Sequence, residues 1–209
     1  MKRTSAPFAR STRMILPARR QVLAGLGAGL VAACTSTPPK REFAEITFTH
    51  EPPILLDVAR VEFVDFVPPP DPPHAEGDFP VPPTAAARRW VLDRLQAVGA
   101  QRTARATLLD ASGIRTDLAT SGGVSGYFTN DQARRYETRV AMRVDIVAEG
   151  SRFVEGFAQA EAAYADTTSE DATINQREAI LYALVEKLMA DFDNRLEGAI
   201  RNYLAAYVR

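Results

Sequence analysis

Residues that often carry catalytic or redox chemistry are scarce in this chain, which has one cysteine and two histidines among 209 residues. A single cysteine allows no disulfide within the chain and no cluster of thiolate metal ligands. The histidines, His50 and His74, both lie close to prolines in segments that we interpret as irregular. A Ser-His-Asp arrangement or a metal site would need one of them beside a serine or carboxylates. We therefore expect two loop histidines, no metal and no catalytic site.

Long hydrophobic runs are also lacking. The apolar, glycine-rich segment 22–33 is too short to cross a bilayer about 30 Å thick, which takes roughly 20 helical residues. The basic pair Arg19-Arg20 precedes it, and small residues end it just before the cysteine. This order is typical of a secretory signal. Residues 1–33 are thus predicted to be a removed signal peptide, and the rest of the chain to be exported.

The residues Val31-Ala32-Ala33-Cys34 resemble the lipobox of bacterial lipoproteins. The resemblance implies that the Cys34 thiol carries diacylglycerol and that this cysteine becomes an N-acylated mature N-terminus, with no other cofactor. In lipoproteins an aspartate after the cysteine causes retention at the inner membrane. Because Thr35 follows instead, the resemblance implies anchoring at the periplasmic face of the outer membrane. The alternative is that Cys34 is an incidental small residue at an ordinary cleavage site.

The residues Arg19 to Leu23 also resemble a twin-arginine export signal, although the usual phenylalanine and lysine are missing. We favour ordinary secretion. The start of translation at Met1 or at Met14 stays open.

The charge of the mature chain is acidic. The leader takes six of the 25 basic residues and no acidic one, which leaves 19 basic against 26 acidic residues and a net charge of −7. Because nucleic-acid binding needs a basic patch, we expect no nucleic-acid partner, and we expect the lipid to hold the chain to the membrane. The remaining length, about 176 residues, is enough for one domain.

Residues 34–45 are polar and rich in proline, and we predict a tether followed by a single domain at 46–209. The pattern predicts a short strand at 46–48 and a long strand at 54–67 with a bulge or bend near Arg60, followed by a proline-rich arm at 68–83. A helix at 85–98 is predicted next, capped by Thr84 and ended by Gly99. A strand at 102–110, a glycine-rich loop and a strand at 136–148 follow.

The strand at 136–148 has the clearest period of two, with Tyr136, Thr138, Val140, Met142, Val144 and Ile146 inward. A turn at 149–151 leads to a strand at 152–164, and a polar break at 166–171 leads to a helix at 173–207. That helix, about 50 Å long, is predicted to overhang the sheet or to bend near Gly198, with Glu186, Asp193 and Arg201 on its outer face. The fold class is α+β, a mixed or antiparallel sheet of about four strands with two helices on one face.

This pattern resembles the lipopolysaccharide-assembly lipoproteins of the outer membrane. The resemblance rests on Cys34 with its tether, the segment Trp90 to Gly99, the hairpin 136–164, and the helix 180–204 with Asp191, Arg195 and Leu196. It implies a non-catalytic assembly or adaptor protein whose partners are an outer-membrane or envelope protein complex and lipopolysaccharide. The proline-rich arm departs from the family pattern. A second resemblance, to auxiliary lipid-binding lipoproteins of ABC-type envelope transport systems, implies an apolar groove between the long helix and the sheet.

Five arginines are candidates for contact with lipopolysaccharide, because guanidinium groups bind phosphates well. We expect several of them around one end of the predicted sheet, and the alternative is ordinary surface arginine. They are Arg102, Arg105, Arg115, Arg134 and Arg135. An envelope hydrolase is a third class, which would require a polar cleft that brings His50 or His74 to acidic partners.

Overall fold

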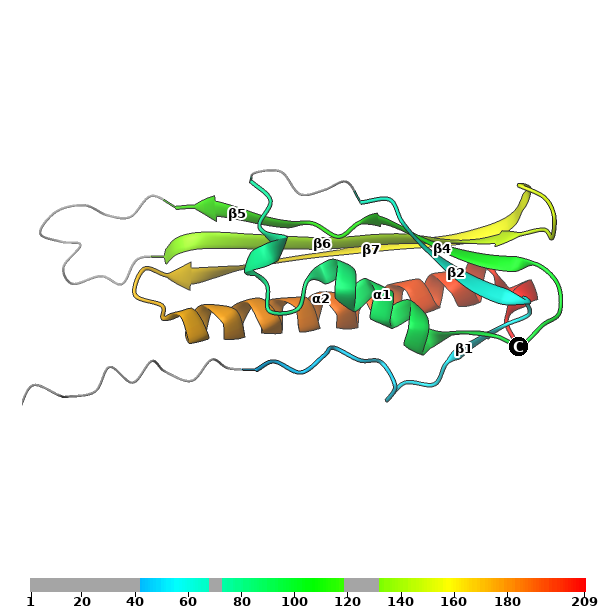
Figure 1. Cartoon of the computed structure of the whole chain (residues 1–209), viewed down its shortest axis with the longest axis horizontal. Helices are drawn as coiled ribbons and strands as arrows, with labels where there is room; N and C mark the ends of the chain where they lie inside the picture. The colour runs from blue at the N-terminus through cyan, green and yellow to red at the C-terminus, as the bar shows by residue number, and fades with distance from the viewer. Residues whose placement is uncertain (1–41, 68–72, 119–131) are drawn as a thin grey trace, which may run out of the picture. The chain divides into compact units, whose positions relative to one another are not determined.

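The computed structural model describes residues 42–67, 73–118 and 132–209, and residues 40–209 form one compact unit. The predicted leader, most of the tether including Cys34, part of the proline-rich arm and most of the glycine-rich loop lie outside the described residues. The described part confirms the α+β class, with five strands in one mixed sheet, two α-helices and the long helix at the C-terminal end (Figure 1).

The main sheet is built around the strand β6 (Gln132–Val147), which is 16 residues long. On one side β6 pairs antiparallel with β7 (Val154–Ser169) along nearly its whole length. On its other side it pairs first with β5 (Gly113–Asp117) and then with β4 (Thr103–Asp110), and β2 (Arg60–Asp65) adds in parallel to β4. The hairpin predicted between β6 and β7 is confirmed, and Gly150 has a φ of 68° in its turn.

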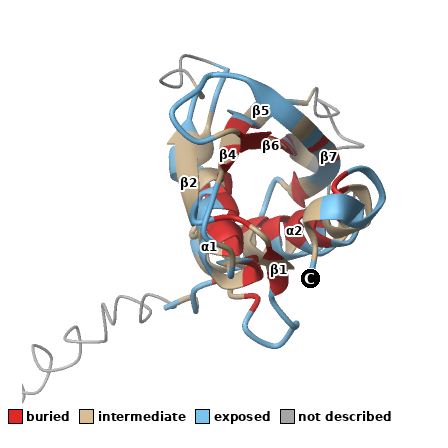
Figure 2. Ribbon diagram, turned by 90° about the vertical axis from the view of Figure 1, so that its right-hand side faces the viewer, coloured by how far each residue is buried: buried red, intermediate tan, exposed pale blue. Residues whose placement is uncertain are grey.

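The inward side of β6 follows the predicted alternation. Its six predicted inward residues are at most 2% exposed, and they face α2 (Ile174–Tyr203) and α1 (Pro83–Arg94). Figure 2 shows the strands curving around both helices, with the buried residues on the inner side. The prediction that both helices cover one face of the sheet is therefore confirmed.

The helix α2 begins with a capping box, in which Thr173 and Gln176 satisfy each other's backbone N–H groups. Its apolar stripe from Leu181 to Leu204 is at most 2% exposed, so helix and sheet close on each other along this seam. No overhang is needed, because 16 strand residues extend about 50 Å and match the helix, about 45 Å long. The expected polar break at 166–171 is also shorter, because β7 continues to Ser169.

In the first half of the domain, the bend predicted near Arg60 is a break between two strands, and the predicted end of the helix is wrong. The segment 54–67 is two strands, β1 (Ile54–Leu56) and β2, and the helix predicted to reach residue 98 ends at Arg94. Residues Leu95–Ala97 instead form β3, which pairs in parallel with β1. The C-terminal tail joins this small sheet where Val208 pairs with Leu56. Tertiary pairing here overrides a local sequence pattern that favours helix.

Smaller details also differ from the predictions. The helix α1 starts one residue before Thr84, at Pro83, with Pro82 at its N-cap, because proline at the first helical position needs no capped N–H. Trp90 is fully buried. The predicted strand at 46–48 is irregular, although Ile46 and Phe48 pack into the core.

The described part of the proline-rich arm lies against β5. His74 makes an isolated bridge to Ile114, and a short 3-10 helix, η1 (Glu76–Asp78), follows. The β5 strand itself was not predicted. Gly113 is needed there because a Cβ atom at this position would lie 2.5 Å from the ring of Phe79.

Candidate functional site

The five candidate arginines do not form one group. Arg105 pairs across the sheet with Asp145, near the β6–β7 turn, and Arg102 directly precedes β4. Arg115 pairs with Tyr136, near the start of β6, and the two remaining arginines are consecutive residues of β6 at that same end. Ten or so strand residues separate the two groups, which is about 30 Å. The expectation that several gather around one end holds only for Arg115, Arg134 and Arg135.

Each candidate arginine already lies near a carboxylate of its own chain. The N–O distances are 2.6 Å for Arg102–Glu155, 3.7 Å for Arg105–Glu62, 3.0 Å for Arg115–Asp78, 3.4 Å for Arg134–Asp117 and 2.7 Å for Arg135–Glu137. A phosphate would have to compete with these carboxylates, and the competition is weakest where the distance is longest and the partner most exposed.

Arg102 has a structural role that the sequence did not indicate. Its φ is 69°, in the left-handed region that few non-glycine residues adopt. Its guanidinium hydrogen-bonds Glu155, which also accepts from the hydroxyl of Tyr207, and lies 5.5 Å from the ring of Tyr207. The Glu155 hydrogen bond raises the pKa of Arg102. Arg102 therefore ties the β6–β7 hairpin to the C-terminal tail.

The two histidines lie in irregular segments. His50 is exposed and lies 3.9 Å from Glu51. His74 Nδ1 lies 2.9 Å from Glu76 Oε1, and the same oxygen accepts the backbone N–H of Gly113. Although burial opposes it, these two contacts hold the pKa of Glu76 below its ordinary value. The pair fastens the segment before α1 to β5.

The strongest buried polar cluster was not predicted. Arg94 is fully buried; its Nε donates to Asp193 at 2.7 Å, and it also donates to Glu197 and to the carbonyl of Pro52. Trp90 Nε1 donates to the same Asp193 oxygen at 2.7 Å. We call these five residues the Arg94 cluster. Asp193, predicted on the outer face of the helix, is 8% exposed, because two donors on α1 face it. The spacing of Trp90 and Arg94, four residues apart on one helix face, was the available signal.

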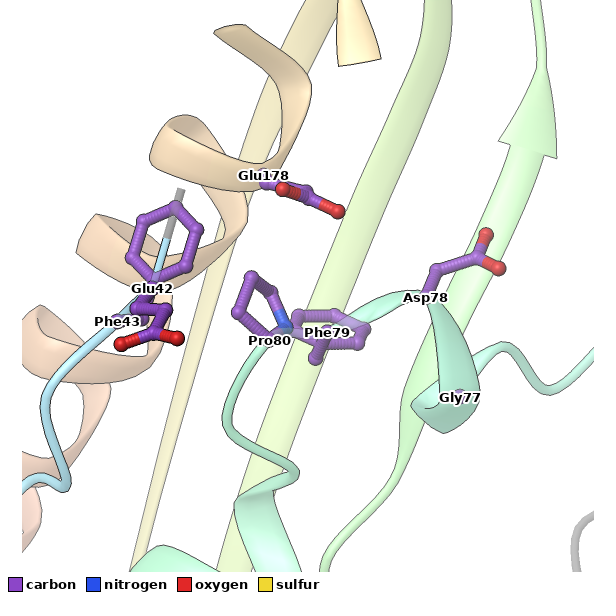
Figure 3. Close-up of a pocket in the computed structure, with 7 residues that line it drawn as sticks. All are labelled: Glu42, Phe43, Gly77, Asp78, Phe79, Pro80 and Glu178. Atoms are coloured by element: carbon purple, nitrogen blue, oxygen red, sulfur yellow. The ribbon is translucent and has the colours of Figure 1, made fainter. Parts of the chain in front are cut away.

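A cavity of about 560 Å³ lies where α2 begins, between the first described residues and the segment before α1. We call it the end cavity; it is lined by Glu42, Phe43, Gly77, Asp78, Phe79, Pro80 and Glu178. Figure 3 shows Glu178 reaching from α2 above Phe79 and Pro80, with Glu42 on the other side. Asp78 turns toward β5, where Arg115 pairs with it.

Polar atoms around the end cavity lack partners. Across the described residues, the buried side-chain atoms without a hydrogen-bond partner belong to Glu76, Tyr136, Arg177 and Glu178. Glu178 lines the cavity, and Glu76 and Arg177 are chain neighbours of residues that do. Tyr136 packs edge-on against Phe79 with 6.2 Å between ring centroids. Burial raises the pKa of Tyr136, as does the nearby charge of Asp78.

Within the described ranges, no cluster of three or more His, Cys, Asp or Glu side chains has the geometry of a metal site. The described helices include none that is both long and apolar enough to span a membrane.

Comparison with known proteins gives a family and only distant structural likenesses. No curated protein matches the chain. A minor lipoprotein from Acinetobacter baumannii is 12% identical over 71% of this chain and 96% of its own, with a TM-score of 0.36. The rare lipoprotein B from Shewanella oneidensis is 14% identical over 68% and 94%, also with a TM-score of 0.36. PelC from Paraburkholderia phytofirmans is 11% identical over 68% and 91%, with a TM-score of 0.21.

The family model named LptE, described as lipopolysaccharide-assembly, matches residues 67–196. The match runs from the end of β2 through α1 and the hairpin into α2, and so covers more than half of the chain. The protein belongs to the LptE lipopolysaccharide-assembly family, as the sequence resemblance implied.

Proposed function

We propose that this chain is a lipoprotein of lipopolysaccharide assembly, held at the periplasmic face of the outer membrane by lipid on Cys34, and that it acts by binding rather than by catalysis. The observation that carries the proposal is the family match over residues 67–196. The lipobox-like Val31 to Cys34 and the signal-like residues before it support the anchor and the location.

The architecture suits a binding role. The core is closed between α2 and the sheet, where the apolar stripe from Leu181 to Leu204 is at most 2% exposed. Charged side chains lie on the outside, where β2 and β4 are joined by one cross-strand ion pair and β6 and β7 by another. We infer that a large envelope protein and lipopolysaccharide contact this outer surface.

The anchor can be tested by expressing the chain with Cys34→Ala. Without the thiol no diacylglycerol can be attached, so we expect the variant in the soluble periplasmic fraction and the unchanged chain in outer membranes. Mass spectrometry of the mature N-terminus checks the modification. An unmodified Cys34 on a membrane-bound chain would contradict the anchor, while leaving the family assignment intact.

The contact with lipopolysaccharide can be tested by comparing the two arginine groups. Replacing Arg134 and Arg135 with glutamine should weaken binding about tenfold, because guanidinium density is highest at that end. Replacing Arg102 and Arg105 should weaken it less, since Arg102 is already held by Glu155. Arg195→Gln, on the exposed side of α2, is the matched control. Unchanged binding in both double variants would remove the arginines from the proposal.

A further inference from the structure

The end cavity has the features of a binding site that is separate from the arginine groups. Its volume of about 560 Å³ is within the range of small-ligand sites. Three rings, of Phe43, Phe79 and Pro80, form apolar walls, and all charged side chains that line it are carboxylates. Asp78 is neutralised by Arg115, whereas Glu42 and Glu178 have no ion pair among the residues that the structure describes.

The second observation is the set of unpartnered polar atoms. Tyr136 is 1% exposed and its hydroxyl has no partner within the described structure. Its ring contacts Phe79, which lines the cavity. Burial and the charge of Asp78 raise the pKa of Tyr136, and the charges of Arg177, Arg134 and Arg115 lower it. Among the described residues, Oε2 of Glu178, which itself lines the cavity, is also buried and unpartnered. Buried polar atoms in folded proteins nearly always find a partner, so Oε2 of Glu178 is short of a donor, while Nε of Arg177, the preceding residue, is short of an acceptor.

We propose that the end cavity binds an organic cation, an ammonium or guanidinium group on a short aliphatic stem. The cation is held between the carboxylates of Glu42 and Glu178, and its stem packs against Phe43 and Phe79. Cations are attracted both to carboxylates and to aromatic faces, and both are present here. A small anion would meet only carboxylates, and a purely apolar ligand would leave Glu178 unpartnered.

Such a group can come from two sources. Lys40 and Arg41 directly precede Glu42 in the sequence and lie outside the described residues. The other source is external, a free amine or a basic side chain of a partner. The variant with Lys40→Ala and Arg41→Ala separates the two, because it leaves the cavity residues unchanged. The inference does not depend on the proposed role in lipopolysaccharide assembly.

The test is calorimetric titration of the full chain in detergent with agmatine and with n-butylamine, and with n-butanol as the uncharged control. We expect a dissociation constant below about 1 mM for agmatine and no binding of butanol. Glu178→Gln should weaken agmatine binding about tenfold, because it removes the charge and keeps the shape. Glu149→Gln, the same change at the opposite end of β6, should leave it unchanged.

The Lys40 and Arg41 variant assigns the source. Tighter agmatine binding in this variant supports the cavity and identifies the chain's own basic residues as competitors, and equal binding supports an external cation. The proposal is overturned if none of these chains binds either amine at about 10 mM. That result would show that water alone fills the cavity. Equal weakening by Glu149→Gln and Glu178→Gln would also overturn it, since the attraction would then be nonspecific.

Discussion

The Arg94 cluster and the end cavity both bring charged side chains against aromatic rings, but they differ in how far their polar atoms are paired. In the Arg94 cluster one fully buried guanidinium meets two carboxylates and a carbonyl, and Trp90 completes the bonding of Asp193. Around the end cavity, one oxygen of Glu178 and the hydroxyl of Tyr136, which packs against Phe79, are buried without a partner among the residues that the structure describes.

The difference indicates different roles. A fully paired ionic cluster fixes α1 on α2 and leaves no group for a ligand, whereas unpaired buried groups cost stability unless something binds them. The Arg94 cluster thus has the features of a stabilising element, and the end cavity those of the binding site that we propose. The predictions below test this division, from the largest expected effect to the smallest.

The largest effect is expected for Asp193→Ala, which takes one of the two carboxylates from buried Arg94 and the Asp193 acceptor from Trp90. Breaking a buried pair from one side costs about 3–5 kcal/mol of unfolding free energy. Chemical denaturation measures it, with Asp191→Ala as the control because Asp191 pairs with Arg195 on the exposed side of the same helix. A loss no larger than that of the control would show that the Arg94 cluster does not stabilise the fold.

Trp90→Phe tests the contribution of a single hydrogen bond within the Arg94 cluster. The ring contact with Phe192, at 5.6 Å between centroids, is largely kept, while the N–H donor to Asp193 is lost. We expect a loss of about 2 kcal/mol, since the hydrogen bond is buried and its acceptor is charged. Denaturation at neutral pH gives the value, and an unchanged midpoint would contradict the role of Trp90 as a necessary donor.

Tyr136→Phe makes the opposite change at the end cavity, because it removes a hydroxyl that has no partner. The expected result is unchanged or slightly higher stability, by up to about 1 kcal/mol. Differential denaturation against the unchanged chain measures it. A loss of 2 kcal/mol or so would show that the hydroxyl is satisfied in solution, and would weaken the case for a missing ligand.

The smallest expected effect is on the stability of the fold at acidic pH. Because the folded pKa of Glu76 is lower than its ordinary 4.5, its contribution is fully present above pH 4.5 and is lost as pH falls through the lowered value. Glu76→Gln should therefore reduce the stability that is lost on acidification below about pH 4.5, by less than about 1 kcal/mol in total. Stability curves at pH 3 to 6 test this, and parallel curves for both chains would contradict it.

The sequence was most informative where one element faces the core along its whole length. The alternation in β6 predicted that strand and its inward face, and α2 was predicted as one long helix, because local pattern and burial agree there apart from Asp193. It failed at Leu95–Ala97, where pairing with β1 ends α1 early, and at β5, whose few residues gave no periodic signal.

The candidate sites were less predictable than the fold. The five arginines were identified by residue type, but their separation along β6 depends on strand register, which one sequence does not specify. Asp193 was assigned to the wrong face because an acidic residue in a helix usually faces solvent, and its two donors are about 100 positions away in the chain. The end cavity joins three segments distant in sequence.

The central claim is that this protein works at the outer membrane by binding partners of lipopolysaccharide assembly. The most direct measurement is to isolate the full chain from outer membranes in mild detergent, and to identify both the modification of Cys34 and what co-purifies. The account predicts a lipid-modified Cys34 together with a large outer-membrane barrel protein and lipopolysaccharide. An unmodified chain in the cytosol, or one that co-purifies with an inner-membrane ATPase complex, would contradict it.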